Sequence, residues 1–587
     1  MNPASSAPAS RIVRRAIPAD VSLPDTLHPV LRRVFAARGA CDATAIDLSL
    51  QGLLRTDALR GMPAAVELLE AALRRDERIV FVADFDADGA TSCALGIRAL
   101  RACGARHVDY VVPNRFEYGY GLTPPIVDLV KAKGADLLIT VDNGISSLEG
   151  VLAAKAYGMK VLITDHHLPG ACLPSADAIV NPNVPGDNFG SKALAGVGVI
   201  FYVMLALRAH LRGTDWFSAR GVVEPNLAAL LDLVALGTVA DVVPLDANNR
   251  RLVAQGIARI RGGHCQAGIA AILRVAGRDP ARLLASDLGF AIGPRLNAAG
   301  RMADMSLGIE CLLSDVPAHC LALANQLDAL NQERRTLERE MKMQALDQVL
   351  QDLPPSGELP HGICLFDPTW HQGIVGVVAG RVKEIYHRPV IAFAAAGEGE
   401  LKGSARSIPG VHIRDVLDTV AARYPGLLSR FGGHAMAAGL ALPRAELARF
   451  TAAFEQVIAA QVDPAALTAF IATDGDLLPT DMTLALARLL STAAPWGQAF
   501  PEPLFDAEFE IQQRRVVGAD HLKLQLGRGA LNFPAIAFNA ADAPWASEAR
   551  QIRAAYRLSI NEYQGRESLQ LVIEHAESID LETAVDR

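Results

Sequence analysis

Residues 80–92 read VFVADFDADGATS, and this stretch decides how the first half of the chain folds. A glycine follows three alternating aspartates (Asp84, Asp86, Asp88 and Gly89), which is also how an EF-hand calcium loop begins. An EF-hand needs a bidentate Glu at its twelfth position, where this chain has Leu95. The run just before the aspartates is short, apolar and β-branched, as in a buried strand. The pattern therefore predicts a strand whose carboxyl end carries three carboxylates.

The same pattern recurs from about residue 76 to residue 182: a short apolar run, polar punctuation, then a helix-length segment. The runs are RIVFVAD, VDYVVP, DLLITVD, KVLITDHH and AIVNP, without alternation of apolar and polar residues. Strands of this type form parallel sheets that helices cover on both faces. Ligands of such sheets bind at the carboxyl ends of the strands. The sequence therefore predicts an α/β domain with its site at one edge of a parallel sheet.

Polar residues gather at the predicted strand ends. Asp142 follows the third run, Asp165, His166 and His167 follow the fourth, and a later apolar segment, LVALGTVAD, ends in Asp241. With the first aspartates, they offer oxygen and nitrogen ligands without a thiolate, which favours Mg²⁺ or, because of the imidazole, Mn²⁺. So many carboxylates would repel one another without cations. We therefore predict two divalent ions about 3.5–4 Å apart, the usual arrangement for phosphoester hydrolysis.

A purely structural interpretation competes with this one for each residue taken alone. Asp84 and Asp165 would cap strand ends, and His167 would be a hydrogen-bonded core histidine. The whole set is harder to explain in this way, because unrelated caps would not all fall on one edge of one sheet. We therefore prefer the metal centre.

The composition limits the class of protein. With 587 residues, 51% of them hydrophobic and 20% charged, the chain should be a globular protein of several domains. Its eight cysteines include no CxxC pair, so we expect reduced thiols in a cytoplasmic protein. The most apolar stretch, from Leu227, is interrupted by Asp232 and Asp241, so we expect no membrane span. The net charge of −8 argues mildly against a polyanion-binding protein, although metal-binding carboxylates contribute to this total.

The rest of the chain divides where the periodicity changes. Helical spacing of apolar residues from Leu323 to Met341, ended by Pro354, predicts one long connector helix. GICLFDPTW, PVIAFA and HAMAAGLAL predict a second, smaller α/β domain. The period-two segments after Phe505 predict a small antiparallel barrel or sandwich, for which an OB-like β-barrel is one candidate. The predicted boundaries are 1–45 for a partly disordered N-terminal extension, 46–314 for the parallel-sheet core, 315–353 for the connector helix, 354–465 for the second domain, 466–577 for the barrel and 578–587 for a tail.

Several short motifs of the chain resemble those of one known family. DFDADG, TVDNGIS, the triplet Asp165-His166-His167 and LGTVADVVPL resemble the four motifs of the DHH phosphoesterase superfamily. PNRFEYGYGL, GPRLNAAGRM, WHQGIVGVVAGR, GSARS and FGGHAMAAGL resemble further motifs of its RecJ family of single-strand-specific exonucleases. The resemblance covers about residues 45 to 577 in the family's order of DHH core, linker helix, DHHA1 domain and OB fold. It implies 5′→3′ degradation of single-stranded DNA to 5′-mononucleotides in repair and recombination, with the strand in a narrow passage between the DHH and DHHA1 domains.

The resemblance also implies a role for each candidate ligand. Asp142 matches the carboxylate that bridges two Mn²⁺ or Mg²⁺ ions. Asp88, His166 and Asp241 match the ligands of one ion, and Asp86 with Asp84 those of the other. His167 would lie beside the scissile phosphate. The catalytic set would then be Asp86, Asp88, Asp142 and His167.

Contacts with single-stranded DNA are implied in the same way. Arg295 and Arg301 lie in a Gly-rich turn and would grip phosphates, although an isolated Arg is often only a solvated charge. Phe505 and Phe509 alternate with polar residues, so we expect them in the barrel core rather than stacked on bases. The barrel residues that would follow a DNA backbone are Arg514, Arg515, Lys523 and Arg528. The candidate substrate-binding residues are Arg115, Tyr120, Arg295, Asn297, Arg301, His371, Ser404, Arg406, Gly433 and His434.

Two other functions stay open. A phosphodiesterase for short oligonucleotides or cyclic dinucleotides would use the same metals, but a small substrate needs no extended barrel. The superfamily's pyrophosphatases carry a metal-binding His where this chain has Val82, which argues against that class. A non-catalytic, single-strand-binding replication scaffold would usually lack metal ligands, whereas this set is complete. We expect a monomer without membrane contact, with a helicase and a single-strand-binding protein as candidate partners.

Overall fold

The computed structural model describes residues 11–579 except 115–116, 119–120, 353–358 and 398. The chain forms two compact units, each assembled from segments far apart in the sequence. The sheet unit comprises Pro18–Gln332 and Ser491–Glu502. The barrel unit comprises Met1–Ile17, Glu333–Leu490 and Pro503–Arg587.

The sheet unit contains the predicted parallel sheet. Its strand order is β3-β2-β4-β5-β6, and all four pairings are parallel. The strands are β2 (Ile79–Ala83), β3 (Val108–Val111), β4 (Leu137–Val141), β5 (Lys160–Thr164) and β6 (Ala178–Val180). Each predicted apolar run is one of these strands, so that prediction is confirmed. β2 and β4 are buried at every position, which explains their continuously apolar sequences.

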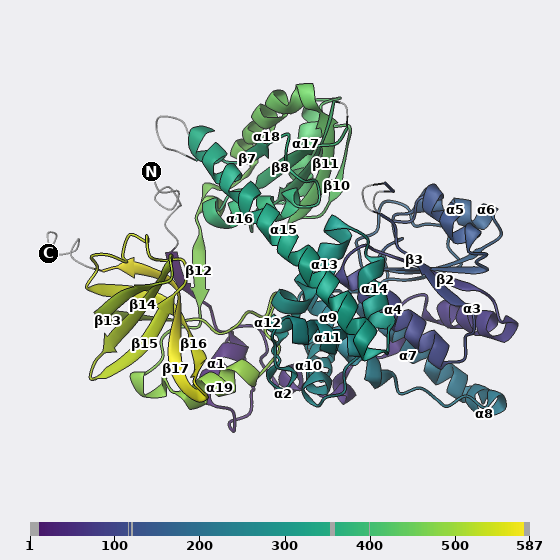
Figure 1. The fold of residues 1–587 in the computed structure, drawn as a ribbon, viewed down its shortest axis with the longest axis horizontal. Coiled ribbons are helices and arrows are strands. Elements are labelled where there is room, and N and C mark those ends of the chain that lie inside the picture. Colours follow the sequence, from purple (N-terminus) through teal and green to yellow (C-terminus); the bar gives the residue numbers. More distant parts are fainter. Residues whose placement is uncertain (1–10, 115–116, 119–120, 353–358, 398, 580–587) are drawn as a thin grey trace. The chain divides into compact units, whose positions relative to one another are not determined.

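Helices cover both faces of this sheet (Figure 1). On one face, Val80 and Val82 of β2 join a buried apolar cluster with α5 (Pro124–Ala132) and α6 (Leu148–Ala156). Phe81 points to the opposite face, which α3 (Met62–Arg75), α4 (Ala87–Ala102) and α7 (Gly196–Gly213) cover. Gly96 of α4 makes room for that ring, because a Cβ there would lie 2.6 Å from it.

α7 is the one helix of the described chain that is long and apolar enough to cross a membrane, with a mean hydropathy of 1.2. However, 61% of it is buried inside the protein. This burial is typical of the core helix of a folded domain, and its packing beside the sheet agrees with that interpretation.

The apolar segment that ends in Asp241 is a helix, α9 (Leu231–Ala240), so this acid does not follow a strand as the other candidate ligands do. α9 is buried from Leu231 to Thr238, and a helix buried on all sides has no apolar stripe that distinguishes it from a strand. Other helices of the sheet unit are α1 (Pro29–Ala36), α2 (Ala43–Ile46), α8 (Trp216–Arg220), α10 (Ala247–Arg261), α11 (Ala267–Val275), α12 (Ala285–Asp287), the π-helix η6 (Leu288–Ile292), α13 (Gly293–Met302) and α14 (Ser306–Leu313).

The predicted connector helix is α15 (Pro317–Asp352), which starts in the sheet unit and ends in the barrel unit. The second α/β domain follows, with the strand order β10-β11-β9-β8-β7. β7 and β8 are parallel and the other pairings are antiparallel. The strands are β7 (Ile363–Phe366), β8 (Val390–Ala395), β9 (Glu400–Arg406), β10 (Arg430–Gly433) and β11 (Ala437–Pro443), with helices α16 (Val375–Tyr386), α17 (Ile413–Arg423) and α18 (Leu447–Gln461). β9 and β10 are the two strands that apolar runs do not predict, since β9 alternates buried and partly exposed residues and half of β10 is glycine.

The C-terminal strands close into a barrel in the order β13-β14-β15-β17-β16. The strands are β13 (Phe505–Val517), β14 (His521–Arg528), β15 (Leu531–Ala537), β16 (Gln551–Tyr563) and β17 (Arg566–Ser578), preceded by the helix α19 (Leu484–Thr492). Phe505 and Phe509 are buried, so their expected place in the barrel core is confirmed. The expectation of a wholly antiparallel barrel is wrong, because closure pairs β15 with β17 in parallel.

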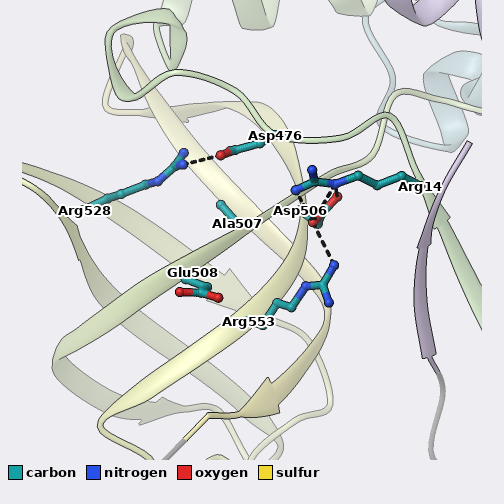
Figure 2. A pocket seen from close by; sticks show the side chains of 7 residues that line it. All are labelled: Arg14, Asp476, Asp506, Ala507, Glu508, Arg528 and Arg553. Carbon is teal, nitrogen blue, oxygen red and sulfur yellow. Dashed lines mark hydrogen bonds and ion pairs between the residues drawn. The ribbon is translucent and has the colours of Figure 1, made fainter. Parts of the chain in front are cut away.

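Part of the predicted N-terminal extension belongs to this barrel unit. β1 (Arg11–Arg14) pairs in parallel with β12 (Phe470–Thr473), although nearly the whole chain separates them. Arg14 and Arg553 both reach Asp506 at the start of β13, at 3.0 Å and 3.2 Å (Figure 2). These side chains line a polar pocket of about 670 Å³, in which Arg528 pairs with Asp476. Because β1 is held by the distant strand β12, no local sequence pattern predicts it.

Candidate metal centre

The turn after β2 holds the three aspartates of the opening motif. Asp86 is the N-cap of α4, and its Oδ1 accepts hydrogen bonds from the backbone N–H groups of Asp88 (2.9 Å) and Gly89 (3.0 Å). A glycine is required at position 89, because a Cβ there would lie 2.4 Å from the carbonyl oxygen of Asp84. Asp84 and Asp88 are buried. DFDADG is therefore a tight strand-to-helix turn that buries carboxylates, as the sequence predicts.

Two helices orient the carboxylate of Asp88. At the start of α7, the backbone N–H of Gly196 donates to Oδ2 at 2.6 Å and that of Val197 donates to Oδ1 at 2.9 Å. The N-terminal end of a helix carries partial positive charge, which favours a carboxylate here. On α9, a Cβ at Gly237 would lie 2.8 Å from Oδ1 of Asp88. The side chain is therefore held in one position before any ligand binds.

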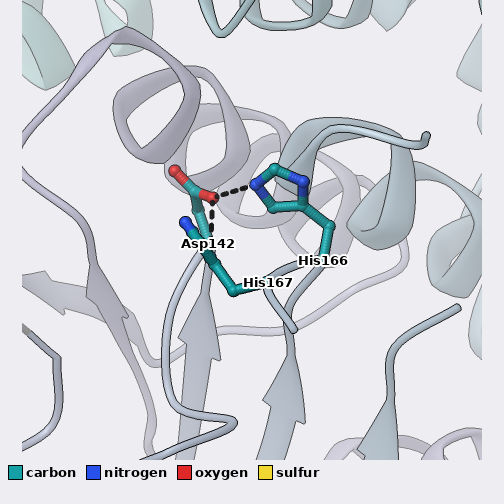
Figure 3. Close-up of side chains that lie close together, drawn as sticks. All are labelled: Asp142, His166 and His167. Atoms are coloured by element: carbon teal, nitrogen blue, oxygen red, sulfur yellow. Dashed lines mark ion pairs between the residues drawn. The ribbon is translucent and has the colours of Figure 1, made fainter. Parts of the chain in front are cut away.

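Asp142 ends β4 in the left-handed region, with a φ of +62°. Asp is one of the few residue types that adopt this conformation without large strain. Gly196 packs against the side chain, since a Cβ there would lie 2.6 Å from the Cβ of Asp142. The carboxylate is buried, and its Oδ1 lies 3.0 Å from Nε2 of His166 (Figure 3). Asp142 therefore lies next to the candidate ligand His166, and its bridging role stays a prediction.

The two histidines after β5 face different surroundings, although their rings lie only 4.5 Å apart. The His166 side chain is 12% exposed and that of His167 is 40% exposed. Asp165 accepts a hydrogen bond from the backbone N–H of His167 at 3.1 Å, and the same oxygen lies 2.8 Å from its Nδ1. Burial alone would lower the pKa of His167, but the hydrogen bond and charge of Asp165 raise it to about 9. The Asp165 carboxylate therefore favours the protonated form of His167, whose side chain is the more exposed of the two histidines.

Asp241 reaches the same place from the C-terminal end of α9. Its Oδ2 lies 3.5 Å from Nε2 of His166. The next residue, Val242, has a φ of +62°, a conformation that a β-branched side chain rarely adopts. Such strain persists only where the surrounding structure imposes it, and it is found mainly at functional sites. The chain thus turns away sharply just after this candidate ligand.

The candidate ligands form overlapping groups, each with ligand atoms within 4.8 Å of one another. The groups are Asp88, His166 and Asp241; Asp84, Asp86 and Asp142; and Asp142, His166 and His167. The structure therefore brings together all six predicted metal ligands, and two of the groups contain the residues predicted to share an ion. Asp142 belongs to two groups, as a bridging ligand would. Their role as ligands stays a prediction.

The electrostatics of the site are those of a cation site. Burial, and then the charge of Asp86, raises the pKa of Asp88 to about 7. Burial and the charge of Asp88 raise the pKa of Asp142 and of Asp241 well above the ordinary 3.8. Burial also lowers the pKa of His166 to about 4, which keeps its imidazole neutral, the form that binds metals. Positive charge among these groups would favour every carboxylate in its ionised form.

Hydrogen bonding gives a second test of whether the residues fit divalent ions. Within the described chain, Nε2 of His166 and Oδ2 of Asp241 are buried and make no hydrogen bond. The His166 ring does bond to the backbone of Leu194, and it must use Nδ1 to do so. Buried polar atoms are rarely left without hydrogen bonds, and metal-binding imidazoles typically bond to the protein through their other nitrogen. The residues therefore fit Mn²⁺ or Mg²⁺.

α13 carries three of the predicted DNA contacts. Oδ1 of Asn297 accepts a hydrogen bond from the backbone N–H of Ala87 at 2.8 Å, so this residue positions the aspartate turn. The guanidinium of Arg295, whose side chain is 15% exposed, pairs with Asp328 at 2.8 Å and donates to the carbonyl of Ala291. A positioning role therefore explains Arg295 better than a phosphate contact does. The DNA contact of Arg301 stays a prediction, and Arg115 and Tyr120 lie outside the described residues.

The predicted contacts of the second domain lie at one end of its sheet. A Cβ at Gly376, near the start of α16, would lie 2.8 Å from the guanidinium of Arg406 and 3.3 Å from the Cβ of Ser404. These two side chains of β9 are therefore next to a helix N-terminus, where anions bind readily. His371 lies just before that helix, and its Nδ1 accepts a hydrogen bond from the backbone N–H of Gly373 at 3.1 Å.

The β10–β11 turn reaches the same end of the sheet. Gly433 has a φ of +146°, and a Cβ there would lie 2.4 Å from the carbonyl oxygen of Ala437. The backbone N–H of His434 donates to that same carbonyl, and Ala437 is opposite Arg406 across the strands. The structure therefore brings Gly433, His434, Arg406 and Ser404 together, as the motifs predict, and their contact with DNA stays a prediction.

Sequence reasoning misses the partner role of Asp165. As the residue between β5 and His166, it has the position of a strand-end cap, and it also accepts a hydrogen bond from the backbone N–H of Ile145 at 2.9 Å. Its contact with Nδ1 of His167 adds an orienting role to that structural one. The available signal is its place beside two histidines, since a carboxylate next to an imidazole commonly fixes the orientation of the ring.

Family comparisons agree with this fold and site. Residues 78–238 match the DHH family, N-terminal domain; residues 360–460 match the DHHA1 domain; and residues 473–575 match the RecJ OB domain. The protein is therefore of the DHH class, and its DHHA1 and OB domains follow in sequence after the sheet domain that holds the candidate ligands.

Individual relatives specify the family. The chain is 52% identical to the single-stranded-DNA-specific exonuclease RecJ of Escherichia coli K12, over 96% of this chain and 98% of that protein. It is 30% identical to the protein of the same name from Bacillus subtilis 168, over 94% of this chain and 69% of that protein. The crystal structure of RecJ in complex with Mn²⁺ from Thermus thermophilus matches with a TM-score of 0.79 at 30% identity, over 97% of this chain and 80% of that one. This chain belongs to the RecJ family.

Proposed function

We propose that the protein is a metal-dependent exonuclease that degrades single-stranded DNA from its 5′ end and releases 5′-mononucleotides. The main support for this proposal is that all six candidate ligands, with Asp142 among them, lie close together. Relatives of the chain are named single-stranded-DNA-specific exonucleases, and two solved RecJ structures contain Mn²⁺ or Mg²⁺. The residues themselves support phosphodiester hydrolysis. The direction and the product follow from the family resemblance.

Each group of the site has a task in this proposal. Asp142 would bridge two ions, one held by Asp88, His166 and Asp241 and the other by Asp84 and Asp86. When bound, Mn²⁺ or Mg²⁺ would supply a Lewis acid that activates water and neutralises charge on the phosphate. Asp165 contacts Nδ1 of His167 and raises the pKa of that ring. Its imidazolium form would stabilise the negative charge that develops on a phosphate oxygen.

One outer face of the barrel has the features of a single-strand-binding surface. Arg515 of β13 and Lys523 of β14 are exposed and lie directly opposite each other. Like charges in this arrangement destabilise a sheet, unless an anion lies between them. His521 lies two residues before Lys523 on the same face of β14. Its ring packs at a steep angle against the half-exposed ring of Phe538, with 5.3 Å between the ring centres. Basic residues beside an exposed aromatic ring suit a DNA backbone and its bases.

The two other basic candidates of the barrel suit DNA less well. Arg514 donates to the backbone carbonyls of Ala546 and Ala549, and Arg528 pairs with Asp476. Both guanidinium groups therefore support the structure of their own unit. Within the barrel, Arg515 and Lys523 are the pair that we assign to phosphates.

Cellular context belongs to the same proposal. We expect the protein to act in the cytoplasm as a monomer, in DNA repair and recombination, with a helicase and a single-strand-binding protein as candidate partners. The predicted passage for the strand between the DHH and DHHA1 domains also stays part of the proposal. These statements rest on the family resemblance.

End-labelled substrates test the proposed activity directly. A long single strand labelled at its 5′ or its 3′ end, and the matching duplex, are incubated with Mn²⁺, with Mg²⁺ or with EDTA. The 5′ label should appear at once as a mononucleotide, the 3′ label should shorten gradually, and EDTA should stop both. Faster cleavage of a dinucleotide than of the long strand would favour the phosphodiesterase instead. Binding without cleavage under all metal conditions would favour the scaffold.

A further inference from the structure

Phe290 is an exposed aromatic side chain in an unusual element. It lies in the π-helix η6 and is 83% exposed. An apolar ring in water contributes nothing to the stability of the fold, so burial does not explain a Phe here. Short π-helical segments are rare and are found frequently at functional sites.

η6 packs against the end of α9 that carries Asp241. A Cβ at Gly289 would lie 3.2 Å from a methyl group of Val239, and a Cβ at Gly293 would lie 3.2 Å from the Cβ of Ala240. Phe290 therefore lies between two glycines that pack against the last turn of α9. The residues they meet, Val239 and Ala240, are two and one residues before the candidate ligand Asp241. The backbone of Phe290 is thus held beside the helix end that leads into Asp241.

The helix that continues from η6 contacts the other ligand-bearing segment. Asn297 of α13 bonds to the backbone of Ala87, and a Cβ at Gly300 would lie 1.8 Å from the carbonyl oxygen of Phe85. One continuous segment, η6 with α13, is therefore packed against both the aspartate turn and the end of α9. The position of Phe290 relative to the candidate ligands is fixed by these contacts on both sides.

The residues that directly follow His167 and the candidate ligand Asp241 also expose apolar side chains. Leu168 after His167 is 67% exposed, and Val242 after Asp241 is 62% exposed. Three exposed apolar side chains therefore lie on segments that carry, or pack against, residues of the metal centre. Phosphate would be held by the ions, and these side chains have no group that binds it. They match the apolar faces of nucleobases.

We propose that Phe290 stacks on an unpaired base of the strand whose backbone lies at the metal centre. The inference rests on the proposed function and adds a contact to it. Inside a duplex, both faces of each base are covered by its neighbours and its edge is paired, so a stack on Phe290 requires a base that is free of both. The contact thus favours a single strand and accepts any base, because every base has an apolar face.

A binding experiment with abasic DNA tests this contact in the full-length protein. The first probe is a hydrolysis-resistant phosphorothioate single strand with a 3′ fluorophore. The second probe is the same single strand with abasic residues throughout its 5′ half. Fluorescence anisotropy with Mn²⁺ gives the affinity of the wild type, Phe290→Ala and Phe290→Trp for both strands. Leu152→Ala is the matched control, since Leu152 is an exposed apolar residue on α6 of the same unit.

Phe290→Ala should bind the base-bearing strand about tenfold more weakly, as expected for one lost base stack. It should bind the abasic strand as the wild type does. Phe290→Trp should keep the affinity for both strands, and so should Leu152→Ala. The thermal unfolding midpoint should not change, because the ring is exposed.

An equal loss on both strands, or no loss on either, would overturn the stacking contact. The wild type is also assayed on an unmodified strand with Mn²⁺, which separates this inference from the proposed function. If the wild type digests that strand but Phe290→Ala shows no selective loss of affinity for the base-bearing strand, only the stacking contact is refuted. Absence of digestion refutes the exonuclease itself.

Discussion

Replacing Asp88 with Asn should change the stability of the metal-free protein in a pH-dependent way. Asp88 is 1% exposed, and burial together with the charge of Asp86 raises its pKa from the ordinary 3.8 to about 7. Each pKa unit corresponds to about 1.4 kcal/mol, so the ionised carboxylate opposes folding by about 4 kcal/mol above pH 7. Asn has the same shape and carries no charge at any pH.

The sign follows from the raised pKa. Between pH 3.8 and 7 the unfolded chain has released this proton while the folded protein still binds it, so stability falls as the pH rises through that window. About half of the penalty is present at pH 5.5 and nearly all of it at pH 8, a difference of about 2 kcal/mol. The bonds from Gly196 and Val197 favour the ionised form of Asp88, and the pKa of about 7 already includes their effect.

Hydrogen–deuterium exchange in EDTA measures this effect locally, because several domains rule out one two-state transition. The opening free energy of peptides from β4 and α4 is compared between Asp88→Asn and the wild type at pH 5.5 and pH 8. The variant should gain about 2 kcal/mol relative to the wild type between the two conditions. Ser92→Ala, buried in the same helix without an ionisable group, should show no such change. If the opening free energies of the variant and the wild type differ by the same amount at both pH values, the raised pKa of Asp88 in the metal-free protein is refuted.

Three further substitutions test other parts of the site. Asp142→Ala should lower hydrolysis by on the order of a thousandfold with unchanged circular dichroism, because it removes the shared ligand, and substantial residual activity would exclude a bridging role. Gly300→Ala should weaken Mn²⁺ binding in calorimetry, because its Cβ would press on the carbonyl of Phe85 in the aspartate turn. Gly170→Ala, with open space around its Cα, is the control, and equal affinity in both variants would contradict the coupling. Arg406→Ala should weaken binding of single-stranded DNA about tenfold, whereas lost turnover at unchanged affinity would count against a DNA contact.

Much of the architecture follows from local pattern. The strands of the parallel sheet are buried on both faces, so their continuous apolar runs identify them without any knowledge of their neighbours. Parallel strands also end at one edge, which is why Asp84, Asp142 and His166 are predicted together before any fold is seen. The connector helix keeps its periodicity because one side of it stays exposed.

The sequence alone therefore determined the sheet, the connector helix, the barrel strands with alternating side chains and the candidate ligand residues that the structure brings together. Only the tertiary structure decided that Asp241 arrives on a helix, that Asp165 orients His167, and that β1 pairs with β12. The physical reason is distance along the chain. Periodicity reports what one segment does with water, whereas these features depend on which remote segment lies against it, and a helix buried on all sides or a short strand with a distant partner leaves no periodic trace.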